Sequence, residues 1–177
     1  MRRSSVWIVA IVVVMILGIC IAKYNGLAVH DQALENAWTP LINVLQPRYD
    51  AVPKYVNEVI LYTSQEDSAT KELSAAYREF KDTTSYDDQI RTASKIEGAL
   101  SVSIIEAGQR YPGITSHYQF MNLEGDFKKS SQQMQPLVAA YNSEVDKYNT
   151  YVRMFPNSIV AMILGFPSKA PYFMREN

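Results

Sequence analysis

The sequence predicts an all-α protein: an N-terminal transmembrane helix followed by an antiparallel, up-and-down four-helix bundle with long first and fourth helices. Residues 6–22 form a run without a charged side chain, and apolar residues recur at steps of three and four through most of the chain after it. Only seven glycines and eight prolines occur among 177 residues, so tight turns are few. We expect a membrane anchor over residues 1–23, a helical bundle over 24–157 and an apolar, membrane-proximal segment over 158–177.

The uncharged run, VWIVAIVVVMILGICIA, gives 19 residues together with Ser4 and Ser5. At about 1.5 Å per residue such a helix is about 29 Å long, close to the hydrocarbon thickness of a bilayer. The side chains expected to face lipid are Val6, Trp7, Ile8, Val9, Ile11, Val12, Val13, Val14, Met15, Ile16, Leu17, Ile19 and Ile21. Two alternatives stay open: a signal peptide cleaved after Cys20-Ile21-Ala22, and a lipoprotein signal, although Ile19 is not the small residue that such a signal needs.

The charges on either side of this run predict its orientation. Arg2 and Arg3 precede it, whereas Lys23 is the only charge that follows before Asp31. Since positive charge stays on the cytoplasmic side, we expect a single-pass protein of the inner membrane with its bundle outside the cytoplasm. Membrane lipid is then the first expected partner.

The first bundle helix is expected between residues 26 and 63, where apolar residues follow one helical face. The residues on this face are Leu34, Trp38, Leu41, Leu45, Tyr49, Val52, Val56 and Val59. Pro40, Pro47 and Pro53 interrupt the segment, and we expect each to bend the helix without ending it, because the apolar face keeps its phase across all three.

Three further helices are expected. The second covers residues 67–81, and the third starts at a cap provided by Asp87 or Asp88 and ends near Arg110. Tyr111-Pro112-Gly113 then stops the chain, and Thr115 or Ser116 is expected to cap the fourth helix. The fourth helix shows a near-heptad seam, made of Phe120, Leu123, Phe127, Ser131, Met134, Val138, Tyr141, Val145, Tyr148, Val152 and Phe155.

Helix lengths suggest that part of the bundle is incomplete. The first and fourth helices span about 57 and 60 Å, against about 22 and 35 Å for the other two. We therefore expect a two-helix stalk near the membrane, whose apolar surface needs a homo-oligomer or a membrane-protein partner. Residues 158–166 are too short to span a bilayer. They either contact the membrane or another subunit, or fold back under the bundle. The contact residues would be Ile159, Val160, Met162, Ile163, Leu164 and Phe166.

Several motifs resemble the LemA family along essentially the whole chain. They are Tyr24-Asn25-x-Leu27, Glu35-Asn36-Ala37-Trp38, Arg48-Tyr49-Asp50-x-x-Pro53, Tyr111-Pro112 with Phe120, and Tyr148-Asn149-Thr150-Tyr151-x-Arg153-x-Phe155-Pro156, continuing through Ala161, Gly165-Phe166 and Tyr172-Phe173. The resemblance implies a bacterial membrane protein with one N-terminal anchor and an antiparallel four-helix bundle, without an established biochemical activity. Gln65-Glu66 stands where the family commonly has a His-Glu pair, and Pro47 where a basic residue usually precedes Arg48, which argues against a catalytic or metal site there.

Composition and motifs exclude several classes of function. Without Arg2 and Arg3, the chain has 15 basic and 18 acidic residues, a net charge of −3. Binding to the phosphate backbone of a nucleic acid needs a basic surface, so we expect no nucleic-acid partner. The single cysteine, Cys20, excludes a disulfide framework and a cysteine-cluster zinc site. His30 and His117 show no metal-binding spacing, and the sequence has neither a phosphate-binding glycine loop nor a G-x-S-x-G motif. We expect no enzyme, no cofactor and no metal.

The polar residues of the family motifs are the remaining candidates for a site. They are Arg48, Asp50, Asn149, Tyr151, Arg153 and Phe155. They form either a buried network that fixes the register of two long helices or a patch that recognises a partner. The expected function is protein–protein contact at the cell envelope, as a scaffold, adaptor or sensor. The alternative is an accessory subunit that presents substrates to a membrane protease or a cell-wall enzyme.

Overall fold

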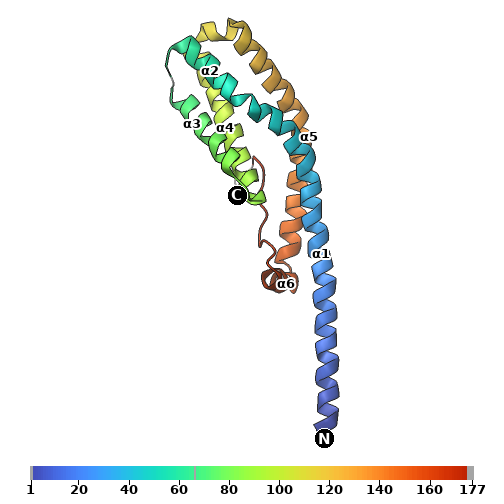
Figure 1. Ribbon diagram of the computed structural model, residues 1–177. Coiled ribbons are helices and arrows are strands. Elements are labelled where there is room, and N and C mark those ends of the chain that lie inside the picture. Colours follow the sequence, from blue (N-terminus) through green and yellow to red (C-terminus); the bar gives the residue numbers. More distant parts are fainter. Residues whose placement is uncertain (1, 66, 175–177) are drawn as a thin grey trace. The chain divides into compact units, whose positions relative to one another are not determined.

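The computed structural model describes residues 2–65 and 67–174, and all the regular secondary structure in these ranges is helical (Figure 1). The helices are α1 (Arg2–Asp50), α2 (Val52–Thr63), α3 (Ser68–Asp82), α4 (Tyr86–Arg110), the 3₁₀ helix η1 (Pro112–Ser116), α5 (Tyr118–Arg153) and α6 (Asn157–Leu164). The all-α prediction is therefore confirmed. The antiparallel packing of four of these helices stays a prediction.

The chain divides into two compact units. Unit 1 contains Met1–Asn36 and Ser143–Ala170, and unit 2 contains Ala37–Asn142 and Pro171–Asn177. Helices α1 and α5 therefore contribute residues to both units, whereas α2, α3 and α4 belong to unit 2 alone and α6 to unit 1 alone.

The N-terminal part of α1 is long and apolar enough to cross a membrane. Its described side chains, such as Trp7, Leu17 and Ile21, are exposed, whereas those of Val6 and Val9 lie outside the described part of the structure. No helix boundary separates this stretch from the residues after Lys23, because α1 continues to Asp50.

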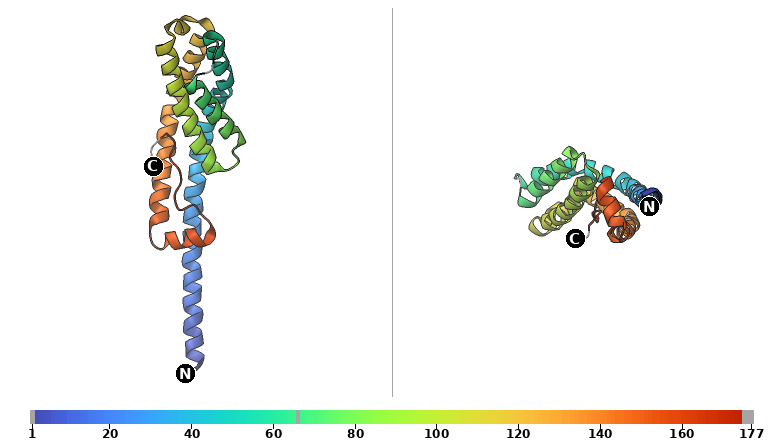
Figure 2. Two further views of the ribbon diagram at one scale, coloured as in Figure 1. Left: turned by 90° about the vertical axis from the view of Figure 1, so that its left-hand side faces the viewer. Right: turned by 90° about the horizontal axis from the view of Figure 1, so that it is seen from below.

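Unit 1 packs the following turns of α1 against the end of α5. Leu27 and Leu34 of α1 and Val145, Tyr148 and Val152 of α5 are all buried. Gly26 lies directly against the Tyr151 ring, where a Cβ atom would collide with the phenol group. The chain then turns through Pro156 into α6, which lies crosswise to the unit 1 part of α1 (Figure 2). Gly165 ends α6 in the left-handed conformation, with φ of 78°.

Unit 2 begins with the second half of α1, which contains both Pro40 and Pro47, as expected. The expectation that this helix continues without interruption to residue 63 is wrong, because α1 ends at Asp50 and a separate helix, α2, starts at Val52. Pro53 has no N–H to donate to the carbonyl group four residues earlier, so the hydrogen-bond ladder is interrupted here. Ala51 keeps helical angles (φ −83°, ψ −12°), and all eight residues of the predicted apolar face are buried.

The ends of the shorter helices differ from the expected caps. Asp67 does cap α3, since its Oδ1 accepts a hydrogen bond from the Thr70 N–H at 2.9 Å. The cap predicted at Asp87 or Asp88 is wrong, because α4 already starts at Tyr86 and both carboxylates lie in its first turn. Thr115 and Ser116 lie inside η1 and do not cap α5, which starts at Tyr118.

The predicted seam of α5 is buried, with Ser131 and Val138 half-buried, as far as Val152. Pro136 lies inside the helix without ending it. Phe155 was expected on this seam and is instead 82% exposed. The helix ends at Arg153, since Pro156 lacks an N–H and disfavours the helical conformation in the residue before it.

Candidate functional site

The best-defined polar cluster of unit 2 is a buried ion pair between α1 and α4. Arg48 Nε lies 2.8 Å from Glu97 Oε1, and Arg48 Nη2 lies 3.0 Å from Glu97 Oε2. Arg48 Nη1 also donates to the Phe127 carbonyl group and to Ser130 Oγ on α5. Its guanidinium carbon lies 5.2 Å from the centre of the Phe127 ring, which adds a cation–π contact. One side chain thus joins three helices.

Burial governs the electrostatics around this pair. It raises the pKa of the Glu97 carboxyl group, and the charge of Arg48 opposes the shift without cancelling it. Next to it, burial and then the charge of Glu97 raise the pKa of Tyr49 well above its usual value, and the Tyr49 hydroxyl donates to the Ala93 carbonyl group at 3.0 Å. A bidentate pair closed off in this way is suited to fixing helix positions.

The six polar candidates from the sequence do not form one network. Asp50 is exposed, accepts a hydrogen bond from Gln46 Nε2 at 3.2 Å and lies 3.8 Å from Lys81 Nζ, so it does not share the partners of Arg48. Arg48 and Asp50 belong to unit 2, whereas the other four belong to unit 1. These four are Asn149, Tyr151, Arg153 and Phe155.

In unit 1, a Tyr–Asn pair on α5 holds the backbone of the segment that follows α6. The buried Asn149 side chain donates to the Ala170 carbonyl group at 3.1 Å and accepts from the Ala170 N–H at 2.7 Å. Tyr148 donates its hydroxyl to the Pro167 carbonyl group at 2.7 Å. A fourth hydrogen bond joins α6 itself to α5, since Asn157 donates to the Tyr151 carbonyl group near the end of α5.

Unit 2 contains a second Tyr–Asn pair with the same chemistry. Asn142 donates to the Phe173 carbonyl group at 2.9 Å and accepts from the Phe173 N–H at 3.0 Å. Tyr141 donates to the Pro171 carbonyl group at 2.9 Å. This repeat is not among the motifs identified in the sequence, although Tyr-Asn occurs at 141–142 and again at 148–149, one heptad later.

The unit 2 Tyr–Asn pair belongs to an aromatic cluster. Phe173 is fully buried, with its ring centre 5.7 Å from that of Trp38, and Trp38 lies 5.4 Å from Tyr141 and 6.3 Å from Tyr86. Burial raises the pKa of Tyr141, and Tyr86 contributes to the same shift. This cluster fastens the C-terminal segment to the core of unit 2.

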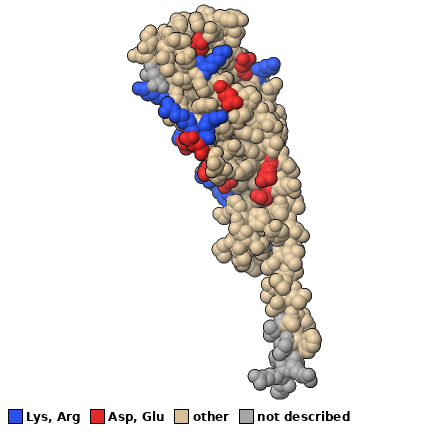
Figure 3. Space-filling model, in the orientation of Figure 1, with Lys and Arg blue, Asp and Glu red and all other residues tan. Residues whose placement is uncertain are grey.

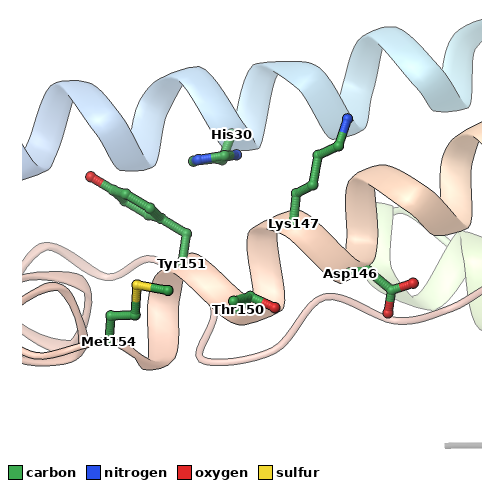
Figure 4. A pocket seen from close by; sticks show the side chains of 6 residues that line it. All are labelled: His30, Asp146, Lys147, Thr150, Tyr151 and Met154. Carbon is green, nitrogen blue, oxygen red and sulfur yellow. The ribbon is translucent and has the colours of Figure 1, made fainter.

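Two of the remaining candidates, Tyr151 and Arg153, each line an open hollow of unit 1, whereas Phe155 lines neither of these two. One hollow has a volume of about 390 Å³ and is lined by His30 of α1 and by Asp146, Lys147 and Tyr151 of α5. The side chains of His30 and Tyr151 face each other across it (Figure 4). The centres of the two rings lie 4.6 Å apart, and His30 is half-buried. Arg153 is exposed and lines a second hollow beside α6.

Within residues 2–65 and 67–174, no group of three or more His, Cys, Asp or Glu side chains could hold a metal ion. His30 lies in unit 1 and His117 in unit 2, where its Nδ1 is 3.9 Å from a carboxylate oxygen of Glu58. Of the Gln65-Glu66 pair, Glu66 lies outside these ranges. The described hydrogen bonds of Arg48 and Asn149 connect different structural elements, whereas that of Asp50 with Gln46 lies within α1.

The chain matches a known protein family. The sequence pattern of the LemA family matches residues 37–177, a range that contains the Arg48–Glu97 pair and both Tyr–Asn pairs. The motifs noted above at residues 24–27 and at 35 and 36 precede the matched range. No curated protein matches the chain.

Proposed function

This chain belongs to the LemA family, and we propose that it is a membrane-anchored protein of the bacterial cell envelope that acts by protein–protein contact, without catalytic activity of its own. Its anchor is the apolar stretch of α1. We further propose that α3, α4, α5 and the α1–α2 segment pack as an antiparallel four-helix bundle. Short connections at 64–67 and 83–85 favour antiparallel neighbours.

The observation that carries the contact function is a set of exposed apolar side chains on the parts of α2, α4 and α5 that lie closest to η1 along the chain. We call this the η1 surface; its residues are Leu61, Tyr62, Val102, Ile105, Tyr118 and Met121, all exposed. The end of α2 contacts η1 here, since the Tyr62 ring centre lies 6.0 Å from that of His117, and the Tyr62 side chain lies directly against Gly113. In the view of Figure 3, charged side chains of unit 2 gather over α3 and α4 and are sparse at this end. Exposed apolar patches of this kind are typical of protein interaction sites.

A site-specific crosslinking experiment tests this proposal. A photoreactive phenylalanine analogue replaces Tyr118 or Met121 in the full-length protein in cells, and Lys129, an exposed polar position on the same helix, provides the matched control. We expect adducts of discrete mass from the first two positions and none from Lys129. Uncrosslinked monomer from every position of the η1 surface, together with a monomeric mass in detergent, would overturn the proposal.

The orientation and location are part of the same proposal: a single-pass protein of the inner membrane with unit 2 outside the cytoplasm. Arg2 and Arg3 before the anchor support this orientation. Protease added to spheroplasts should digest unit 2, while the same protease added to intact cells should not. Protection in spheroplasts, with digestion only after lysis, would place unit 2 in the cytoplasm.

The second candidate function is an accessory subunit that presents substrates to a membrane protease or a cell-wall enzyme. Arg153 and Phe155 favour it, because both are exposed although the family motif contains them. Changing both to alanine should abolish co-purification of that enzyme and leave helicity intact. Unchanged co-purification would exclude this alternative.

A further inference from the structure

Helix α6 presents an apolar face that no described side chain of unit 1 covers. Its buried side is formed by Asn157, Val160 and Ala161. On the other side Met162 is 76% and Ile163 71% exposed, and Ile159 is also exposed. Just before the helix, the exposed side chains of Met154 and Phe155 extend this apolar surface. So much exposed apolar area on one short helix indicates a surface that is covered in its working environment.

The position of α6 in unit 1 indicates what covers it. The ring of Phe166, just after α6, packs edge-on against Tyr24 at 5.9 Å. Tyr24 follows Lys23, the first charge after the stretch of α1 that is long and apolar enough to span a bilayer. Helix α6 therefore lies at the end of that stretch, and it lies crosswise to α1 (Figure 2). A helix crosswise to a spanning helix at this level lies parallel to the membrane surface.

The charges of unit 1 agree with such a location. Residues 1–30 and 147–170 contain no Asp or Glu, whereas Lys23, Arg153 and Lys169 lie within them. The first carboxylates beyond these two ranges are Asp31 on α1 and Asp146 on α5. They lie at a similar height along the two helices, because Asp146 lines the same hollow as His30, the neighbour of Asp31. The end of unit 1 that carries α6 thus combines apolar groups with basic residues, which suits anionic lipid headgroups.

We propose that α6, with Met154, Phe155 and Phe166, is an interfacial helix that binds the headgroup layer of the bilayer that α1 spans. This inference rests on the proposed membrane anchoring by α1. It gives the protein a second lipid contact, which sets the orientation of unit 1 on the membrane and makes that contact sensitive to anionic lipid.

Depth-resolved fluorescence quenching tests this proposal in the full-length protein. With Cys20 changed to serine, single cysteines at Met162, Met15 and Ile105 carry an environment-sensitive dye in nanodiscs of equal parts phosphatidylcholine and phosphatidylglycerol. Ile105 is the control, since it is an exposed apolar residue of α4 in unit 2. We expect a nitroxide just below the headgroups to quench the dye at position 162, a nitroxide deep in the acyl chains to quench it at 15, and neither to quench it at 105.

The three dye positions distinguish failure of the interfacial-helix proposal from failure of the proposed membrane anchoring. Quenching at 15 but not at 162 overturns the interfacial helix and leaves the anchor in place. Absence of quenching at 15 overturns the anchoring itself, and with it the premise of this inference. Protection of the dye at 162 from aqueous iodide without lipid quenching also overturns it, because a protein surface, such as a second copy, then covers α6.

A charge-insertion variant supplies an independent test. Met162→Glu with Ile163→Glu places carboxylates at exposed positions. Gln132→Glu with Gln133→Glu, at exposed positions of α5 in unit 2, is the matched pair. With the dye at position 155, we expect lipid quenching to be lost in the α6 variant and kept in the α5 variant, at equal helicity. Replacement of phosphatidylglycerol by phosphatidylcholine should weaken quenching in the parent protein. Unchanged quenching in the α6 variant overturns the proposal.

Discussion

Unit 1 and unit 2 bury different kinds of polar side chain, although both are built on α1 and α5. Among the described residues, the buried polar side chains of unit 1 are the amides Asn149 and Asn157. Those of unit 2 include the ionisable side chains of Arg48, Glu58 and Glu97. A buried charge costs far more to desolvate than a buried amide, so it must gain more from its partners.

The difference follows from what each group holds in place. The amides of unit 1 bind backbone close in sequence, since Asn157 reaches six residues back and Asn149 reaches 21 residues forward. Arg48 reaches Glu97, 49 residues away, and the Phe127 carbonyl group, 79 residues away. We conclude that the buried amides of unit 1 hold α6 and the segment after it close to the end of α5, whereas the buried ion pair of unit 2 fixes helices against one another.

The largest expected effect comes from breaking the ion pair of unit 2. Arg48→Met leaves Glu97 buried without its partner, and should lower the free energy of unfolding by about 3–5 kcal/mol. Urea unfolding of the full chain in a mild detergent, followed by circular dichroism, measures this loss. The matched control is Lys95→Met, which removes an exposed ion pair with Glu79 and should cost less than about 1 kcal/mol.

A double variant tests the physical reason for this loss. Arg48→Met with Glu97→Leu removes both charges, and should recover most of the stability lost in Arg48→Met. If Arg48→Met costs no more than Lys95→Met, the ion pair does not fix the helices of unit 2.

Removing the aromatic anchor of the C-terminal segment should have the next largest effect. Phe173→Ala empties a fully buried site beside Trp38 and should cost about 3 kcal/mol. The environment of Trp38 changes at the same time, so near-ultraviolet circular dichroism should lose intensity. The neighbouring exposed residue gives the control, Met174→Ala, which should cost less than about 0.5 kcal/mol. Equal costs would show that the segment is not anchored by Phe173.

The two Tyr–Asn pairs allow a direct comparison between the units. Asn149 and Asn142 form the same two hydrogen bonds with one backbone residue each, but Asn149 is buried and Asn142 only half-buried. Because water can replace a lost partner at the more exposed site, Asn149→Ala should cost about 2 kcal/mol and Asn142→Ala about 1 kcal/mol. Chemical unfolding of the two variants under one condition gives both values. A larger cost for Asn142→Ala would contradict this assignment of burial.

The sequence was sufficient to predict which faces of the helices are buried. Steps of three and four place Leu34, Trp38 and Leu41 on one face whatever they pack against, and all three are buried. It was not sufficient where a local rule competes with periodicity. Phe155 continues the numerical pattern of α5, yet Pro156 ends the helix before it, so the exposed ring belongs to a turn.

Contacts between residues distant in sequence were not predictable from periodicity. Periodicity shows which face of a helix is buried, but not which residue of another helix it contacts. Glu97 did carry a signal, since a carboxylate beside Ile96 and Leu100 on an apolar face of α4 requires a buried partner. The sequence around Glu97 did not indicate that Arg48, 49 residues away, is that partner. The repeated Tyr-Asn dipeptide was a second signal, but hydrogen bonds to backbone groups of an extended segment leave no trace in the sequence of that segment.

The last expected effect is a dependence of stability on alkaline pH that originates in unit 2. Burial raises the pKa of Tyr55 to about 12, against about 10 in an unfolded chain. Above pH 10 the unfolded state therefore releases a proton that the folded state keeps, and stability falls as pH rises from about 10 to about 12. At pH 11 this single group should remove about 1.4 kcal/mol of unfolding free energy.

Tyr55→Phe abolishes the titration, so the variant should lose about 1.4 kcal/mol less than the parent between neutral pH and pH 11. Tyr118→Phe, at an exposed position of the same unit, provides the control and should follow the parent. Equal losses in the parent and in Tyr55→Phe would mean that Tyr55 is not closed off from water, and that the core of unit 2 is more open around this residue than its contacts with Phe120 and Phe127 indicate.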